Sequence, residues 1–286
     1  MPYIYRYLRF PEGKAKAVTF SYDDGHICDI RLSDLFTKYG LKATFNFNSY
    51  KMRDNGITVE DAKEHILDKG HEIAVHGAFH KAEGRQRPAE AIRDVLTCRE
   101  ELENTFGRII RGMAYPDSGI RKISNYTSYE TIKRYLTDLD IAYSRTLNQD
   151  NNDFELPLDW HAWVPTAHHG NAKLFDWIDE FVNFDVIGFP GSVAHRFPRL
   201  FYVWGHSFEF DRAQNWERAE EMCQKLSGKD DIWYATNIEI YEYVTAYNSL
   251  VYSADGKRVY NPTATKIWFE ADRTPYVINP GETIVI

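Results

Sequence analysis

The stretch Ala15-Lys16-Ala17-Val18-Thr19-Phe20-Ser21-Tyr22 runs directly into Asp23-Asp24-Gly25. Its β-branched and aromatic residues partly alternate with small or polar ones, which predicts a strand, and the Asp-Asp-Gly sequence predicts the turn that ends it. We therefore expect two carboxylates at the carboxyl end of a strand. An ordinary surface turn is the alternative interpretation of Asp23-Asp24-Gly25.

Helix and strand patterns alternate along most of the chain after this stretch. Residues 30–39 have apolar side chains at helical spacing, and the β-prone run 43–47 follows them, so the first 47 residues predict a β-α-β unit. The pattern continues with helices at 58–69, 88–105, 128–139, 172–183 and 216–225 and strands at 72–75, 109–114, 142–145 and 201–204. Six or seven such units favour a parallel barrel or a doubly wound sheet.

The pattern changes at about Asn248. Apolar pairs on both sides of Asp255-Gly256 predict a hairpin, and further β-prone runs between turn residues extend an all-β segment. We expect residues 1–247 to form the barrel and residues 248–286 to form a small β-rich tail packed on it. The tail contains no His, so we expect it to contribute no catalytic group.

Composition and charge exclude several classes of protein. Of the 286 residues, 43% are hydrophobic and 27% are charged, which argues against a disordered or fibrous chain. The net charge is −8 and no block of Lys or Arg occurs, so we expect no nucleic-acid partner. No run of 18 apolar residues occurs either, so we expect no membrane span. The oligomeric state does not follow from these features.

The amino terminus and the cysteines bear on the compartment. The first ten residues contain two arginines and no apolar stretch of signal-peptide length, which predicts a cytoplasmic location; a chain whose leader had been removed would look the same and would be secreted. Cys28, Cys98 and Cys223 are too far apart for a Cys-x-x-Cys metal motif and too few for a disulfide framework. We expect them to be small buried hydrophobes.

Two histidines four residues apart follow the predicted strand 72–75. In His76-Gly77-Ala78-Phe79-His80 both imidazoles can reach one metal ion, although such pairs also occur in cores and on surfaces. Catalytic residues of barrels gather at the carboxyl ends of different strands, so the placement of Asp23-Asp24 strengthens the metal interpretation. One carboxylate and two imidazoles leave positions for water and substrate. Non-haem iron oxygenases use a similar set, but on a different fold and with an oxidisable cosubstrate.

These motifs together resemble those of a known family. Ser21-Tyr22-Asp23-Asp24-Gly25 is similar to the Thr-Phe-Asp-Asp-Gly motif, and residues 76–80 to the His-Ser/Thr-x-x-His motif, of the polysaccharide deacetylases, carbohydrate esterase family four with its NodB-homology domain. The resemblance spans roughly residues 18–243. It implies a distorted (β/α) barrel with seven strands and a metal-dependent hydrolase that removes acetyl groups from N- or O-acetylated sugars, with an acetylated saccharide as its partner.

The resemblance also implies a role for each motif residue. Asp23 would be the general base. Asp24, His76 and His80 would hold a divalent metal, with Zn²⁺ expected and Co²⁺, Ni²⁺ or Mn²⁺ able to replace it. His206, after the late strand, would be the general acid that protonates the leaving group.

Other segments match the family less closely. Ala114-Tyr115-Pro116-Asp117 corresponds to its Arg-x-Pro-Tyr segment but lacks the arginine that steadies the base. Arg145, at the end of the next predicted strand, is either the substitute or a plain surface arginine. A backbone N–H near Tyr115 is expected to stabilise the oxyanion. Leu158-Asp159-Trp160 partly matches the segment whose aspartate pairs with the acid histidine, so Asp159 is the expected partner there.

Aromatic and imidazole side chains flank these motifs. Four residues are expected to line the substrate groove, with core packing as the alternative for the tryptophans: Tyr115, Pro116, Trp160 and Trp204. His168-His169 either reaches the cleft or is a solvated loop pair.

Three functions remain open from the sequence. The first is the sugar deacetylase. The second is an amidase that acts on a small non-sugar amide with the same fold. The third is a carbohydrate-binding protein that has lost turnover, which the missing arginine motivates. Asp23 and His206 together favour an enzyme, because a binding protein needs neither a base nor an acid.

Overall fold

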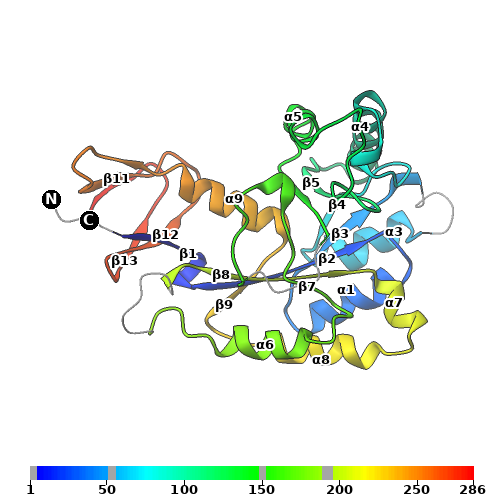
Figure 1. Cartoon of the computed structure of the whole chain (residues 1–286). Coiled ribbons are helices and arrows are strands. Elements are labelled where there is room, and N and C mark those ends of the chain that lie inside the picture. The colour runs from blue at the N-terminus through cyan, green and yellow to red at the C-terminus, as the bar shows by residue number, and fades with distance from the viewer. Residues whose placement is uncertain (1–4, 51–55, 148–152, 189–195) are drawn as a thin grey trace.

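Seven parallel strands form the main sheet of the computed structural model, which describes residues 5–50, 56–147, 153–188 and 196–286 (Figure 1). The order across the sheet is β6 (Tyr143–Arg145), β5 (Gly112–Ala114), β4 (Glu72–Val75), β3 (Thr44–Phe47), β2 (Lys16–Asp23), β8 (Arg199–Gly205) and β7 (Ala167–His168). The sheet curls into the distorted seven-stranded barrel that the resemblance implied, and the doubly wound alternative is wrong.

One segment of chain joins the two edge strands of this sheet. The Trp163 N–H donates to the Ser144 carbonyl in β6 at 3.1 Å, and the Thr146 N–H donates back to the Trp163 carbonyl at 2.9 Å. The same segment then enters β7, where Ala167 pairs with Val203 of β8. A further strand, β9 (Ile232–Tyr234), pairs with the first half of β2.

Helices surround the sheet. The longer ones are α1 (Cys28–Lys38), α4 (Pro88–Phe106), α5 (Tyr129–Asp138), α6 (Leu174–Asn183), α8 (Trp216–Leu226) and α9 (Asn237–Asn248). The shorter ones are α3 (Val59–Asp61), α7 (Ser207–Arg212), the 3₁₀ turns Pro11–Gly13, Glu83–Arg85 and Trp160–Ala162, and a π turn at Ala62–Leu67. The predicted helices agree with these bounds to within a few residues, whereas α7 and α9 were not predicted.

The core lies on both faces of β2. All eight residues of this strand are buried, because neighbouring strands flank it and side chains cover both of its faces. Phe20 packs on Phe36 of α1 with ring centroids 4.5 Å apart, and burying each such ring contributes about 2 kcal/mol. All three thiols are free; Cys98 and Cys223 are buried as predicted, whereas Cys28 is only half-buried.

Two small antiparallel sheets adjoin α9 at one end of the molecule (Figure 1). One contains β10 (Val251–Tyr252), β11 (Arg258–Tyr260) and β14 (Thr283–Val285), and the other contains β1 (Arg6–Arg9), β12 (Ile267–Ala271) and β13 (Thr274–Ile278). The amino-terminal strand β1 therefore pairs with the carboxyl-terminal region. Glu270 of β12, which is buried, forms ion pairs with Arg9 of β1 and with Arg196. The domain division at residue 247 stays a prediction.

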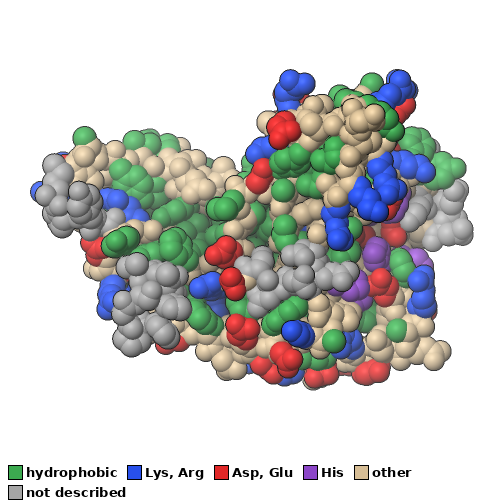
Figure 2. Space-filling model, in the orientation of Figure 1, with side chains coloured by type: hydrophobic (Ala, Val, Ile, Leu, Met, Phe, Trp, Pro, Cys, Tyr) green, Lys and Arg blue, Asp and Glu red, His purple; other side chains and the backbone are tan. Residues whose placement is uncertain are grey.

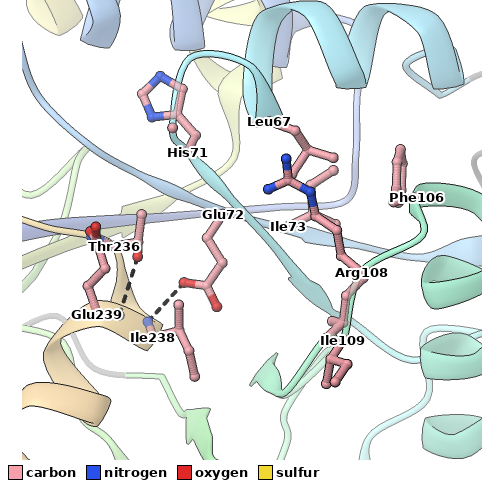
Figure 3. Close-up of a pocket in the computed structure, with 12 residues that line it drawn as sticks. Leu67, His71, Glu72, Ile73, Phe106, Arg108, Ile109, Thr236, Ile238 and Glu239 are labelled. Atoms are coloured by element: carbon pink, nitrogen blue, oxygen red, sulfur yellow. Dashed lines mark hydrogen bonds between the residues drawn. The ribbon is translucent and has the colours of Figure 1, made fainter. Parts of the chain in front are cut away.

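The N-terminal ends of the barrel strands carry a pocket of about 260 Å³ (Figure 3). Glu72, at the start of β4, lies at this end with Thr236 and Ile238 of the α9 amino terminus. Its carboxylate accepts the Ile238 N–H at 2.9 Å, as the dashed line in Figure 3 shows. This end of the barrel is therefore tied together by a buried polar network.

Candidate active site

The predicted pair of carboxylates lies where the sequence placed it, at the carboxyl end of β2. Asp23 is the last residue of the strand and is 2% exposed, and Asp24 follows with φ = 87°. Gly25 continues the turn at φ = 63°, and a Cβ there would lie 3.1 Å from the Phe47 ring. The tight turn therefore needs glycine, and it directs the two carboxylates into different surroundings.

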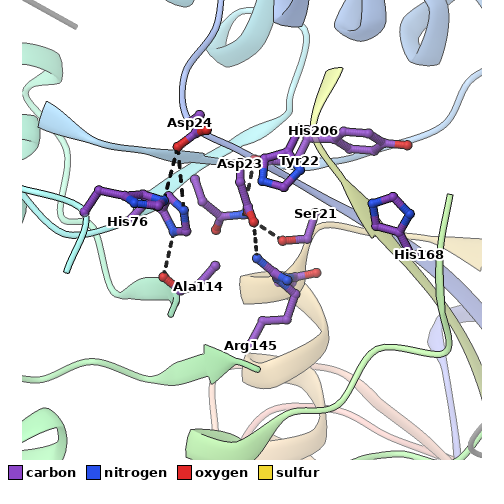
Figure 4. Close-up of polar contacts among 12 residues, drawn as sticks. Ser21, Tyr22, Asp23, Asp24, His76, Ala114, Arg145, His168 and His206 are labelled. Carbon is purple, nitrogen blue, oxygen red and sulfur yellow. Dashed lines mark hydrogen bonds and ion pairs between the residues drawn. The ribbon is translucent and has the colours of Figure 1, made fainter. Parts of the chain in front are cut away.

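Side chains from two other strands, β3 and β6, hold Asp23. Its Oδ2 forms an ion pair with Nη2 of Arg145 at 2.5 Å, and its Oδ1 accepts a hydrogen bond from Nδ2 of Asn46 at 2.9 Å (Figure 4). The Arg145 side chain is fully buried, and its guanidinium lies 4.6 Å from the Trp204 ring centroid. Arg145 thus places a guanidinium beside Asp23, and it is not a plain surface arginine.

These contacts set the ionisation of Asp23. Burial by itself would raise the pKa of this carboxyl group, but the Arg145 guanidinium and the nearby His76 outweigh burial and lower the pKa below its usual value. Asp23 is consequently an anion at neutral pH. Among the described residues, none accepts a hydrogen bond from two atoms of this buried guanidinium, Nε and Nη1 of Arg145.

Asp24, His76 and His80 come together on the other side of the strand end. Asp24 Oδ1 lies 3.9 Å from His76 Nε2 and 3.5 Å from His80 Nε2, and one ligand atom from each residue lies within 4.8 Å of the others (Figure 4). His76 Nδ1 donates to the Ala114 carbonyl at 2.9 Å, which leaves Nε2 for a ligand. The set of one carboxylate and two such imidazoles fits a zinc-type divalent ion.

The loop between the two histidines is shaped by contacts that sequence reasoning missed. Gly77 has φ = 69°, and a Cβ there would lie 2.7 Å from Asp94 Oδ2 and 3.3 Å from Pro116. Asp94 of α4 accepts the Phe79 N–H at 2.7 Å. The sequence did contain a signal for the role of Asp94: this carboxylate lies on the otherwise apolar, buried face of α4.

His206 follows β8 and begins α7. Its Nδ1 forms a hydrogen bond with Glu209 Oε1 at 3.3 Å. Burial by itself would lower the pKa of His206, but this hydrogen bond and the negative charge of Asp23 raise it above the usual value.

Asp159, the predicted partner of His206, lies elsewhere, and that prediction is wrong. Its carboxylate accepts hydrogen bonds from Tyr129 and Lys133, each at 2.8 Å. It also caps the 3₁₀ turn Trp160–Ala162. Asp159 is therefore committed to α5 and to its own turn, whereas Glu209, three residues after His206 in the first turn of α7, supplies the carboxylate.

The expected groove residues have different positions. The Tyr115 N–H donates to the Arg145 carbonyl at 3.0 Å and its hydroxyl donates to the His161 carbonyl, so both donors of Tyr115 are already engaged. The oxyanion donor near Tyr115 stays a prediction. Trp160 packs edge-on against Trp163 and Tyr241 in the core. Trp204 is nearly buried but lies against Arg145 and His168.

His80 and His206 are partly exposed, whereas Asp23 and His76 are buried beneath them. Figure 2 shows histidine side chains gathered beside acidic ones, on the side where α3 and α7 lie in Figure 1. Among the described residues, no helix has the length and apolar character needed to cross a membrane.

One family model matches part of the barrel. Residues 10–133 match the family model described as polysaccharide deacetylase. This segment contains Asp23, Asp24, His76 and His80, whereas His206 lies beyond it. This segment of the chain is therefore similar to the polysaccharide deacetylases, as its motifs indicated.

Solved structures share the fold. A protein from Mycobacterium smegmatis assigned to the polysaccharide deacetylases superposes with a TM-score of 0.59 at 19% identity, over 84% of this chain and 94% of that chain. Another from Pseudomonas aeruginosa PAO1 gives 0.57 at 15% identity, over 82% and 92%. A variant of a family four pseudoenzyme with restored activity gives 0.50 at 16%, over 82% and 70%. No curated protein sequence matches the chain.

Proposed function

We propose that this chain is a metal-dependent deacetylase that removes acetyl groups from N- or O-acetylated sugars. The observation that carries the proposal is the position of Asp23. Arg145 and Asn46 hold its carboxylate at the same strand end as Asp24, which faces His76 and His80. An ionised base beside a site for a divalent ion is what metal-assisted hydrolysis requires, and the family match of residues 10–133 supports that reaction class.

Asp24, His76 and His80 would hold the ion. Bound there, Zn²⁺ would supply Lewis acidity toward an acetyl carbonyl and toward water, and Co²⁺, Ni²⁺ or Mn²⁺ are alternatives because N and O ligands discriminate poorly among them. The hydrogen bond from His76 Nδ1 to the Ala114 carbonyl fixes the tautomer and the ring orientation that ligation by Nε2 needs.

Asp23 accepts the proton of the attacking water. The ion pair with Arg145 keeps the carboxylate ionised, and the Asn46 amide fixes its other oxygen. Its two bonded oxygens still have lone pairs free for a proton. Because the surrounding groups are already oriented, little reorganisation is needed when the proton moves.

His206 protonates the departing amine or alkoxide. Glu209 engages Nδ1, so Nε2 is the nitrogen left for the leaving group. The raised pKa keeps a fraction of the imidazole protonated near neutral pH, as a general acid requires.

The Arg145 contact bears on the competing functions. The absent arginine in the Ala114–Asp117 segment motivated a binding protein without turnover, and Arg145 removes that motive by pairing with Asp23 from the next strand. An amidase acting on a small non-sugar amide would use the same residues and stays an alternative. The acetylated substrate and the cellular compartment remain proposals.

Acetate release tests the activity directly. The purified protein should release acetate from at least one of three substrates: chitooligosaccharides, peptidoglycan fragments and acetylxylan. A small non-sugar amide in the same panel tests the amidase. Hydrolysis of that amide alone would replace the sugar deacetylase, and no hydrolysis of any substrate would favour the binding protein.

Metal content tests the ligand assignment. At substoichiometric zinc, His80→Ala should bind far less metal than the wild type. His65→Ala is the matched control, since His65 pairs with Asp34 on the surface. Equal metal content in the His80→Ala and wild-type proteins would contradict the assignment.

A further inference from the structure

Two histidines near His206 take no part in the steps proposed so far. His168 ends β7 and His169 follows it, and the register of β7 with β8 places His168 beside Trp204, two residues before His206. His169 is buried and His168 is half-buried, so they are not the solvated loop pair that the sequence left open. Figure 4 draws His206 between Asp23 and His168.

Both of these imidazoles face the carboxylate of Glu209, in the first turn of α7. Glu209 Oε2 lies 3.0 Å from His168 Nε2 and 2.9 Å from His169 Nε2, whereas Oε1 forms the hydrogen bond with His206 Nδ1 at 3.3 Å. Burial by itself would raise the pKa of Glu209, but its contacts with the three imidazoles outweigh burial and lower the pKa. One anionic carboxylate therefore serves three rings.

The remaining ring nitrogens show where the protons lie. The Gly170 N–H donates to His168 Nδ1 at 3.0 Å, so the neutral ring carries its proton on Nε2, toward Glu209. Within the described residues, His169 Nδ1 has no hydrogen-bond partner, whereas its Nε2 faces an anion that only accepts, so its proton is also on Nε2. By the same rule His206 carries a proton on Nδ1, and Nε2 is left for the leaving group.

The His169 ring is closely packed. It stacks on Phe210 of α7, with ring centroids 4.1 Å apart, and on Tyr22 of β2 at 5.6 Å. A Cβ at residue 205 would clash with His169 Nδ1, so Gly205, directly before His206, leaves the room that this ring needs. The packing thus keeps His169 Nε2 directed at the carboxylate.

We infer that His168 and His169 are positioning residues for the general acid: they hold the Glu209 carboxylate, and Glu209 in turn orients the His206 ring. The inference rests on the proposed function, which makes His206 the proton donor. Because two ring N–H groups engage Oε2, the carboxylate is fixed against rotation away from His206. His206 Nε2 then meets the leaving group in one orientation, and little reorganisation precedes proton transfer.

Two substitutions of the half-buried His168 test this role. Gln presents an amide N–H in place of Nε2–H, whereas Leu has no donor. On an acetamido sugar, kcat should fall about tenfold in His168→Leu and no more than about threefold in His168→Gln, with little change in KM. His65→Leu, a surface control, should keep the wild-type kcat. Equal kcat values for His168→Leu and His168→Gln would overturn the inference. His168→Ala replaces His168→Leu if that variant does not fold.

The loss should depend on the leaving group. An activated aryl acetate releases an aryloxide that needs no proton, so His168→Leu should hydrolyse it at nearly the wild-type rate. An equal loss on the acetamido sugar and the aryl acetate would show that His168 only supports the fold, and it would overturn the inference.

A double-mutant cycle tests whether His168 acts through Glu209. Glu209→Ala should lower kcat on the acetamido sugar at least as much as His168→Leu does. Adding His168→Leu to Glu209→Ala should then change kcat less than about twofold, because the group that His168 holds is already absent. Losses that multiply in the double variant would overturn the inference.

NMR of ¹⁵N-labelled histidine rings gives a readout that needs no activity. At a pH where the rings are neutral, His206 should carry its proton mainly on Nδ1 in the wild type, because Glu209 accepts it there. His168→Leu should reduce this share, and His168→Gln should keep it. The same share in all three proteins would overturn the inference. If the wild type releases no acetate from any substrate, the proposed function fails, and the NMR result still decides whether His168 holds Glu209.

Discussion

The two ends of the barrel use buried carboxylates in opposite ways. At the N-terminal ends of the strands, Glu72 accepts hydrogen bonds from the Thr44 hydroxyl at 2.7 Å, the Tyr143 hydroxyl at 2.8 Å and the Ile238 N–H at 2.9 Å. These donors are neutral, and burial raises the pKa of Glu72 to about 7.

At the carboxyl ends of the strands, the polar groups are charged and less completely paired. Asp23 faces a guanidinium, and its pKa is lowered despite burial. Within the part of the chain that the structure describes, Arg145 Nε and Nη1 have no hydrogen-bond partner. Leaving such buried groups unpaired costs about 1–3 kcal/mol each. The hydrogen-bonded groups at the N-terminal ends of the strands stabilise the fold. The unpaired polar groups at the carboxyl ends are free to contact a ligand.

The largest expected effect is at Asp23. Asp23→Asn keeps the size of the side chain but removes the proton acceptor, so kcat should fall by about 10² or more, the usual contribution of a general base. Bound metal, measured in the same samples, should stay at the wild-type level. Full activity of this variant would assign the base to another residue and remove the functional contrast between the two ends.

The next effect separates the acid from a structural role. His206→Ala should reduce hydrolysis of an acetamido sugar by about 10², but that of an activated aryl acetate far less, because an aryloxide leaves without a proton. The ratio of the two rates is the measurement. Equal losses on both substrates would mean that His206 only supports the fold.

A smaller effect is expected at the guanidinium. Arg145→Lys keeps the positive charge beside Asp23 but loses the planar fork and its stacking on Trp204. Activity should fall about tenfold, which corresponds to one weakened charge-assisted hydrogen bond. The kcat of Arg145→Lys is compared with that of Arg111→Lys, a half-buried control residue directly before β5 whose Nε donates to the Asp140 carbonyl. Similar kcat values for both variants would contradict a role for Arg145 at the base.

The smallest effect on activity is expected at the opposite end, where Glu72→Gln should change kcat less than about twofold. Stability should respond to pH instead. Between about pH 4.5 and 7 the folded state keeps the Glu72 proton and the unfolded state has lost it, so this group's contribution to the free energy of unfolding decreases as pH rises.

The glutamine variant cannot titrate at this position, so its stability relative to the wild type should improve by up to about 3 kcal/mol from pH 4.5 to pH 7. Urea unfolding of both proteins at the two pH values measures this change. The difference in the free energy of unfolding between wild type and variant could also be the same at both pH values. That result would show that Glu72 does not hold its proton in the folded state.

The sequence predicted most of the barrel because its elements are locally consistent. Apolar spacing, Pro88 at the start of α4 and Gly107 at its end define that helix without any tertiary contact. α9 was missed because its β-branched and aromatic residues suit a strand, although Thr236 and Glu239 form a capping box that marks its start. The pairing of β1 with β12 joins residues from opposite ends of the chain, and no local pattern reports it.

The candidate site shows the same division. Asp23, Asp24, His76 and His80 were found because each motif is short and ends a strand, and parallel strands bring their carboxyl ends to one edge. Asp159 was assigned wrongly to His206 because a short sequence match does not show which way a side chain points; the competing donors of α5 hold it elsewhere.

By itself the sequence determined the βα alternation, the two motifs and the class of chemistry they support, because these depend on residue type and on spacing within a few residues. Only the tertiary structure decided that Arg145 holds Asp23, that Glu209 serves His206, and that His168 lies beside them. Those contacts join strands and helices far apart in the chain. Their geometry follows from how the barrel curls and closes, which depends on packing of the whole core and not on any one segment.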